Sequence, residues 1–225
     1  MTADDVLARI AAAGSEHNRQ GMARFGISIE RAAGVSVAWL RALGREIRRD
    51  HDLALALWAS GQHEARILAG IVADPARLDI ALAEAWVAEF DSWDLCDQTC
   101  QNLLWRLPDA VAVAVAWTAR EPEFERRAGF ALGAVLCRRL KNADDELRPL
   151  LTAVARQAGD PRNFVKKAAN WCLRELGKHS ADLHAEACAL AEQLIDSASA
   201  PARWIGRGAL RELTSARILA KLGLG

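Results

Sequence analysis

The chain has 225 residues, of which 52% are apolar and 26% charged, which excludes a disordered chain or a disulfide-stabilised miniprotein. Basic and acidic residues number 29 each, so the net charge does not by itself indicate a nucleic-acid or membrane partner. The five cysteines are odd in number and irregularly spaced, which is typical of reduced thiols in a cytoplasmic protein.

The composition favours helices along the whole chain. Alanine, the strongest helix former, occurs 46 times, whereas proline occurs six times. Apolar residues recur with a helical period, as Val37, Leu40 and Leu43 illustrate. In chain order, the predicted helices span residues 3–13, 36–49, 51–60, 63–72, 78–90, 93–105, 108–117, 123–140, 144–157, 162–176, 182–195 and 201–213.

Two segments fit this pattern less directly. Residues 15–34 are polar and contain three glycines, so we expect a loop there. Residues 110–116 alternate Ala and Val as a strand could, but their uniformly apolar character and helical neighbours favour a buried helix. Because the connectors are short, consecutive helices should pack as antiparallel pairs. The sequence therefore predicts an all-α solenoid in which residues 1–225 form a single domain.

Charge is unevenly distributed despite the neutral total. Residues 74–97 carry seven acids and one arginine, whereas residues 120–180 carry 13 basic residues and eight acids. Residues 201–225 carry five basic residues and one glutamate. The curvature of a solenoid could gather the basic segments on one face, as in a nucleic-acid-binding protein. Ordinary solvated helix surfaces explain the same asymmetry.

The segment from Asp91 to Asp97, with the sequence DSWDLCD, combines an aromatic ring with carboxylates. Trp93 and Asp97 are four residues apart and so share one helix face. An aromatic surface beside an anion can stabilise an oxocarbenium-like sugar, and the anion can also hold a water molecule. Alternatively, Trp93 is a core residue and Asp97 a surface acid.

A second segment, residues 160–178, interleaves cations with aromatic residues. Such a helix can grip phosphates while it presents a ring to a base or sugar. An amphipathic helix with its tryptophan in the core is the alternative. The cations are Arg162, Lys166, Lys167, Arg174 and Lys178, and the aromatic residues are Phe164 and Trp171. A third segment, residues 124–128, opens a predicted helix with the paired arginines Arg126 and Arg127, which also fit a solvated helix start.

Together these segments resemble the AlkD-type DNA glycosylases, the HEAT-like-repeat family that removes alkylated purines from DNA. The resemblance spans nearly the whole chain. Its main motifs are FGI at residues 25–27, GVS at 34–36, DHDLA at 50–54, HEARILA at 63–69, WDLCD at 93–97, NFVKKAANW at 163–171, RWI at 203–205 and ALREL at 209–213. The resemblance implies a right-handed α-solenoid of HEAT-like antiparallel helix pairs with a concave DNA-binding face, on which the lesion is attacked without being flipped into a deep pocket.

The resemblance also implies roles for individual residues. The family's catalytic acid falls on Asp97, and its two substrate-flanking tryptophans fall on Trp93 and Trp171. Its DNA-contacting arginine matches Arg127, with Arg126 as the alternative one residue away. The predicted DNA-binding residues are Arg126, Arg162, Lys166 and Lys167. The chain contains no tyrosine, so any position that the family fills with tyrosine is filled differently here.

The resemblance thus implies a DNA N-glycosylase that acts on cationic N3- or N7-alkylated purines in duplex DNA. We expect a cytoplasmic, nucleoid-associated monomer that needs no cofactor, no metal and no membrane. Cys96 and Cys100 have a spacing that could chelate a metal, but further ligands are lacking nearby, so we expect no zinc site. The alternative function is a non-catalytic HEAT-like module that binds DNA structure or a protein partner.

Overall fold

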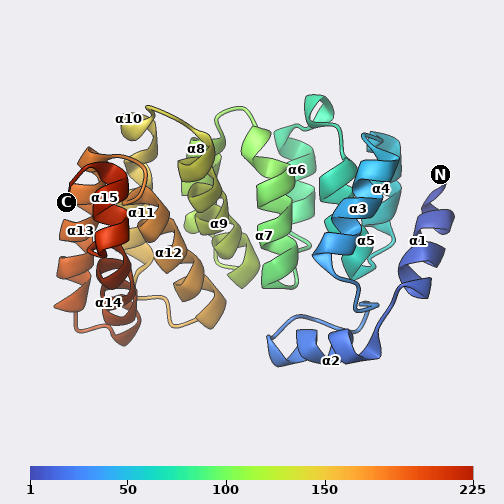
Figure 1. The fold of residues 1–225 in the computed structure, drawn as a ribbon, viewed down its shortest axis with the longest axis horizontal. Coiled ribbons are helices and arrows are strands. Elements are labelled where there is room, and N and C mark those ends of the chain that lie inside the picture. Colours follow the sequence, from blue (N-terminus) through green and yellow to red (C-terminus); the bar gives the residue numbers. More distant parts are fainter. Residues whose placement is uncertain (225) are drawn as a thin grey trace. The chain divides into compact units, whose positions relative to one another are not determined.

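The computed structural model describes residues 1–224, and within that range every regular element is a helix (Figure 1). The contacts divide the chain into two compact units, a first unit of residues 1–108 and a second unit that begins at Asp109. The expectation of a single domain stays a prediction. Among the described residues, no helix is long and apolar enough to cross a membrane.

The first unit contains seven α-helices and two 3₁₀ turns. They are α1 (Ala3–Ala12), α2 (Glu16–Arg24), α3 (Val37–Ile47), α4 (His51–Ala59), α5 (His63–Val72), η1 (Pro75–Arg77), α6 (Ile80–Val87), α7 (Trp93–Asn102) and η2 (Leu104–Arg106). Helix α5 packs against α3, α4 and α7, so it forms the centre of this unit. Between α4 and α6, the rings of Trp58 and Trp86 stack with centroids 4.1 Å apart.

The second unit consists of helices alone among its described residues. They are α8 (Ala110–Thr118), α9 (Glu123–Arg139), α10 (Asp144–Leu147), α11 (Pro149–Gln157), α12 (Asn163–Leu176), α13 (Ala181–Ile195), α14 (Ala200–Leu213) and α15 (Ala216–Leu222). Helix α9 packs against both α8 and α12 and is buried from Arg126 to Cys137. A Cβ atom at Gly129 would lie 2.4 Å from the backbone nitrogen of Thr118, so only glycine permits the close approach of α8 and α9.

Short polar side chains begin many of these helices as expected. Ser36, Asp50, Asp79 and Ser180 each accept a hydrogen bond from a backbone N–H in the first turn of the helix that follows. Each such cap contributes about 1 kcal/mol to stability. The start of α5 has a different polar contact, because the buried Glu64 carboxylate accepts hydrogen bonds from the backbone N–H groups of residues 33–35. This contact fixes the segment that leads into α3.

The largest differences from the sequence prediction occur in three places. The loop prediction for residues 15–34 is wrong over α2, which Ser15 caps and which buries none of its side chains. The predicted helix 144–157 is divided into α10 and α11 at Pro149, which lacks the backbone N–H that would continue the helical hydrogen bonds. Helix α15 was not predicted, because it is short and buries only Ile218. Residues 110–116 are helical, as predicted.

Candidate functional site

Trp93 and Asp97 lie one turn apart on α7, at the end of the first unit. Asp97 is 9% exposed, and the residues between and beside the two, Leu95, Cys96 and Cys100, are buried. Trp93 is partly exposed, and its indole Nε1 donates a hydrogen bond to the carbonyl oxygen of Phe25 at 3.1 Å. The ring is therefore held against the segment that follows α2. This arrangement combines a carboxylate of low exposure with an oriented aromatic ring.

Phe25, the first residue of the FGI motif at 25–27, is an aromatic residue at this site for which the sequence predicted no role. Its side chain is 72% exposed, which is unusual for a large apolar residue in a folded protein. It lies at the C-terminal end of α2, next to Gly26, whose φ of 74° turns the backbone. Its sequence signals are its place in the FGI motif and a large aromatic residue within a mostly polar segment.

The first turn of α7 is anchored to α5 by a buried ion pair. Asp94 Oδ2 lies 2.9 Å from His63 Nε2, and the His63 side chain is nearly inaccessible to solvent. Burial lowers the pKa of His63, but the hydrogen bond and the charge of Asp94 outweigh this effect and leave the pKa above its ordinary value. The pair therefore fixes the helix turn from which Trp93 projects.

The paired arginines of the second unit are both buried and connect the start of α9 to the start of α12. Arg127 is 5% exposed and donates a hydrogen bond to the carbonyl oxygen of Phe164 at 2.7 Å. Arg126 is 9% exposed and donates to Asp160 Oδ2 at 2.7 Å. The alternative interpretation, in which both arginines are solvated at the start of a helix, is therefore wrong.

Asp160 forms ion pairs with two of the predicted DNA-binding residues, Arg126 and Arg162. Burial raises the pKa of Asp160, but hydrogen bonds from Arg162 and Arg126 lower it more, to about 2. Part of the positive charge of these arginines is thus offset within the protein. Their roles in DNA binding stay predictions.

Helix α12 carries the remaining predicted residues of the second unit. Lys167, Trp171 and Arg174 follow one another at helical spacing along its exposed side. The Trp171 indole donates to Glu175 Oε1 at 3.3 Å, which holds the ring against its own helix. Lys166 lies on a different side, with its Nζ atom 4.9 Å from the centroid of the Trp204 ring on α14. Lys166 and Lys167 therefore face different surroundings.

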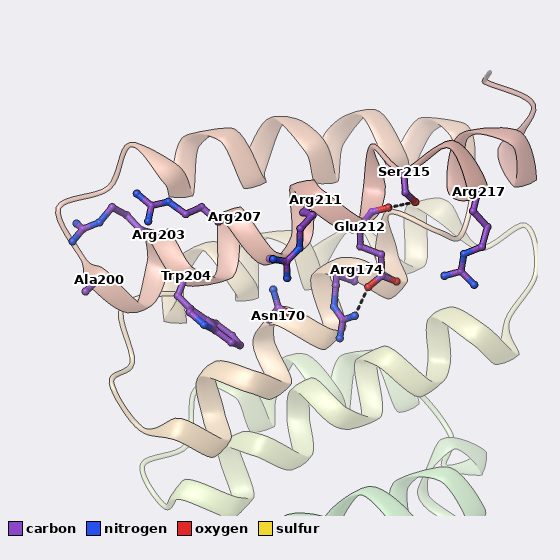
Figure 2. A pocket seen from close by; sticks show the side chains of 11 residues that line it. Asn170, Arg174, Ala200, Arg203, Trp204, Arg207, Arg211, Glu212, Ser215 and Arg217 are labelled. Carbon is purple, nitrogen blue, oxygen red and sulfur yellow. Dashed lines mark hydrogen bonds and ion pairs between the residues drawn. The ribbon is translucent and has the colours of Figure 1, made fainter.

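The structure also reveals a basic pocket of about 930 Å³ between α12 and α14 (Figure 2). Our sequence reasoning noted the basic C-terminal segment but named no site residues in it. Its signal was the regular spacing of Arg203, Arg207 and Arg211, which places all three on one face of α14. In contrast, no group of three or more His, Cys, Asp or Glu residues that could hold a metal occurs within residues 1–224.

The four residues that the resemblance assigns to catalysis belong to different units. Trp93 and Asp97 lie in the first unit, and Arg127 and Trp171 in the second. Each unit holds its own pair in a fixed local setting. The action of the four residues on one nucleotide stays a prediction.

Comparison with known proteins agrees with the helical architecture. A solved structure with 22% sequence identity superimposes with a TM-score of 0.79 over 94% of this chain and 95% of the other. It is described as one of a new family of proteins related to the HEAT-like repeat DNA glycosylases with affinity for branched DNA structures. This similarity confirms the predicted HEAT-like fold.

No curated protein matches the chain. The sequence model of the DNA alkylation repair enzyme family, however, matches residues 6–213, which is nearly the whole chain. This match includes both tryptophans, the aspartate and the paired arginines described above. The chain therefore belongs to the DNA alkylation repair enzyme family.

Proposed function

We propose that this protein is a DNA glycosylase that hydrolyses the N-glycosidic bond of cationic N3- or N7-alkylated purines in duplex DNA. The observation that supports this activity most directly is the pair on α7, a carboxylate of low exposure one turn from an oriented tryptophan. Family membership points to the same class of DNA damage. No metal or organic cofactor is required for such a reaction.

The chemistry follows from the charge of the substrate. Alkylation at N3 or N7 makes the purine cationic, so it leaves as a neutral base when the bond between C1′ and nitrogen breaks. Positive charge then develops on the sugar, where the Asp97 carboxylate stabilises it and the Trp93 ring offers its electron-rich face. Asp97 orients a water molecule whose oxygen forms the new bond to C1′, and the water proton passes to the carboxylate and then to solvent.

The second unit contributes residues that hold the DNA in this proposal. Arg127 contacts a backbone phosphate near the lesion, since a guanidinium offers several donors in a rigid plane. Trp171 packs against the sugar and backbone. Arg126, Arg162, Lys166 and Lys167 contact phosphates farther along the strand, where each contact displaces a counterion.

The direct test is incubation of the protein with duplex DNA that contains N7-methylguanine, followed by detection of the free base. We expect release above the spontaneous rate from this duplex and none from the unmodified duplex of the same sequence. Release at the spontaneous rate, with the duplex shown to be bound under the same conditions, would contradict the proposed activity.

A second candidate function is the non-catalytic recognition of branched DNA. It is favoured by the solved structure of the same fold, which is described as having affinity for such DNA. The two functions are separated by the base-release assay together with binding to a junction. Tight junction binding without base release would support recognition alone.

We predict that replacing Lys166 and Lys167 together with alanine weakens duplex binding at all sequences. Two lost phosphate contacts should reduce the slope of log K against log salt by about 1.8, because each contact contributes about 0.9. A salt titration by fluorescence anisotropy measures this slope. The matched control is Arg45→Ala with Arg49→Ala, which removes the same charge from exposed positions of the first unit. An unchanged slope in the lysine variant would show that these side chains do not contact DNA.

A further inference from the structure

The pocket between α12 and α14 in the second unit is strongly basic and has no role in the proposed reaction. Its volume of about 930 Å³ lies near the upper end of the range for ligand pockets, roughly 300–1,000 Å³. It is lined mainly by Arg174, Arg203, Trp204, Arg207, Arg211 and Arg217, with Glu212 as its one acidic residue. A site of this size and charge suits an anion larger than a single phosphate.

Three of the five arginines are available to a ligand. Arg174 pairs with Glu212, and Arg203 donates to the carbonyl oxygens of Ser197 and Ala198. The other three, Arg207, Arg211 and Arg217, are exposed and form no ion pair with any residue from 1 to 224. Because they are also spread along the pocket, these guanidinium groups can contact several ligand oxygens at once.

The spacing of the arginines on α14 matches a chain of phosphates. Arg207 and Arg211, both available to a ligand, are four residues apart, which is a rise of about 6 Å along the helix. Arg203 precedes them at the same interval, with one guanidinium nitrogen already bonded to backbone carbonyls. This rise is of the order of the distance between successive phosphates on one nucleic-acid strand. Figure 2 shows the three side chains in a row along α14.

Trp204 adds a flat apolar surface to the same pocket. It is 44% exposed, although tryptophan is highly buried on average, and its ring points from α14 toward α12 (Figure 2). Lys166 places a cation over the ring at 4.9 Å. Exposed rings within a cationic groove are the platforms on which unpaired bases stack.

The pocket is formed by a rigid contact between its two helices. Asn170 on α12 is buried and donates to the carbonyl oxygen of Ile205 on α14 at 2.9 Å. A Cβ atom at Gly208 would lie 3.0 Å from the Asn170 side-chain nitrogen, so α14 has a glycine at this contact. Helix α14, which carries the arginine row and Trp204, is thus fixed against α12 before any ligand binds.

We propose that this pocket binds an unpaired segment of a DNA strand, with its phosphates on the α14 arginines and one base stacked on Trp204. Intact duplex fits less well, because its base faces are covered by their neighbours and only a strand end, gap or branch can offer one. The inference rests on the proposed function in that it takes DNA as the ligand, but it does not depend on base release.

The test compares binding of a labelled single-stranded oligonucleotide with binding of the corresponding duplex by fluorescence anisotropy. Trp204→Ala should lower the affinity for the single strand by about 5- to 150-fold, the equivalent of one lost base stack. The ratio of single-strand to duplex affinity should fall with it. Trp204→Phe should restore most of this ratio, since phenylalanine keeps a ring for stacking.

A double variant, Arg207→Ala with Arg211→Ala, tests the contribution of the arginine charges separately. It should reduce the slope of log K against log salt for the single strand by about 1.4, or 0.7 per contact. The control is Arg156→Ala, an exposed arginine on α11 that lines a different pocket and should leave both affinities unchanged. The inference would be overturned if wild type and Trp204→Ala had the same ratio of single-strand to duplex affinity. It would also be overturned if Arg156→Ala lost as much single-strand affinity as the pocket variants. If the wild-type protein released no base, the proposed function would be overturned. The ratio of single-strand to duplex affinity would still test the pocket.

Discussion

Asp97→Asn is expected to reduce single-turnover release of N7-methylguanine by roughly 10²–10³-fold while leaving the melting temperature and the duplex affinity unchanged. Asparagine has nearly the same volume as aspartate and retains hydrogen-bonding atoms, so the packing on α7 should survive. The negative charge is lost, and a neutral amide stabilises a developing oxocarbenium poorly. We expect the lower end of this range, because a cationic base leaves readily without much help.

The control is Asp91→Asn, which removes one carboxylate charge at an exposed position just before α7. It should retain the wild-type rate. Equal rates in Asp97→Asn and wild type would remove Asp97 from the chemistry. A large fall in the melting temperature would instead assign a structural role to Asp97, which is only 9% exposed.

Asp160→Asn is expected to have the largest effect on stability, a loss of about 3–5 kcal/mol in the free energy of unfolding. The substitution removes the carboxylate that Arg126 and Arg162 share, and Arg126 is left as a buried charge without its nearest partner. Chemical denaturation at neutral pH measures the loss. Asp109→Asn is the matched control, because Asp109 is exposed and its positive φ suits asparagine equally. A loss below 1 kcal/mol would show that the network contributes little.

The same network predicts how stability depends on pH. Because the folded-state pKa of Asp160 is lowered from 3.8 to about 2, its contribution is complete above the unfolded-state pKa. It is lost as the pH falls from about 4 toward 2, where the folded carboxyl takes up its proton. The difference in unfolding free energy between wild type and Asp160→Asn should therefore shrink across this interval. A difference that stays constant down to pH 2 would contradict the assignment.

The sequence predicts most helices because their signals are local. Helix α5 runs from His63 to Val72 as predicted, since its apolar period is clear and Ala73 is followed by Asp74 and a proline. Helix α2 escapes prediction because it buries none of its side chains and thus has no apolar period to detect. It is held by the Ser15 cap and by a hydrogen bond from Asn18 to the carbonyl oxygen of Gly34, neither of which gives an apolar period.

Contacts between residues far apart in the chain could not be predicted from local sequence patterns. Nothing local shows that Arg126 pairs with Asp160, since the two residues are 34 positions apart and meet only when α9 packs against α12. The arginine row on α14 could be read from its spacing, but its pocket exists only because Asn170 and Gly208 bring α12 close. The resemblance to a family supplied Asp97 and the tryptophans, whose residue types alone left the core interpretation open.

Helix α2 has no buried residue, and this sets how readily the structure around Trp93 can move. A helix without buried side chains opens at little cost, so its amide hydrogens should exchange with solvent much faster than those of α9, which is buried along most of its length. Each opening can also release the Phe25 carbonyl that holds the Trp93 indole. The Trp93 ring would then gain freedom to move, while Asp97 stays fixed in the core. The ring could thus adjust to an incoming nucleotide without unfolding of the first unit.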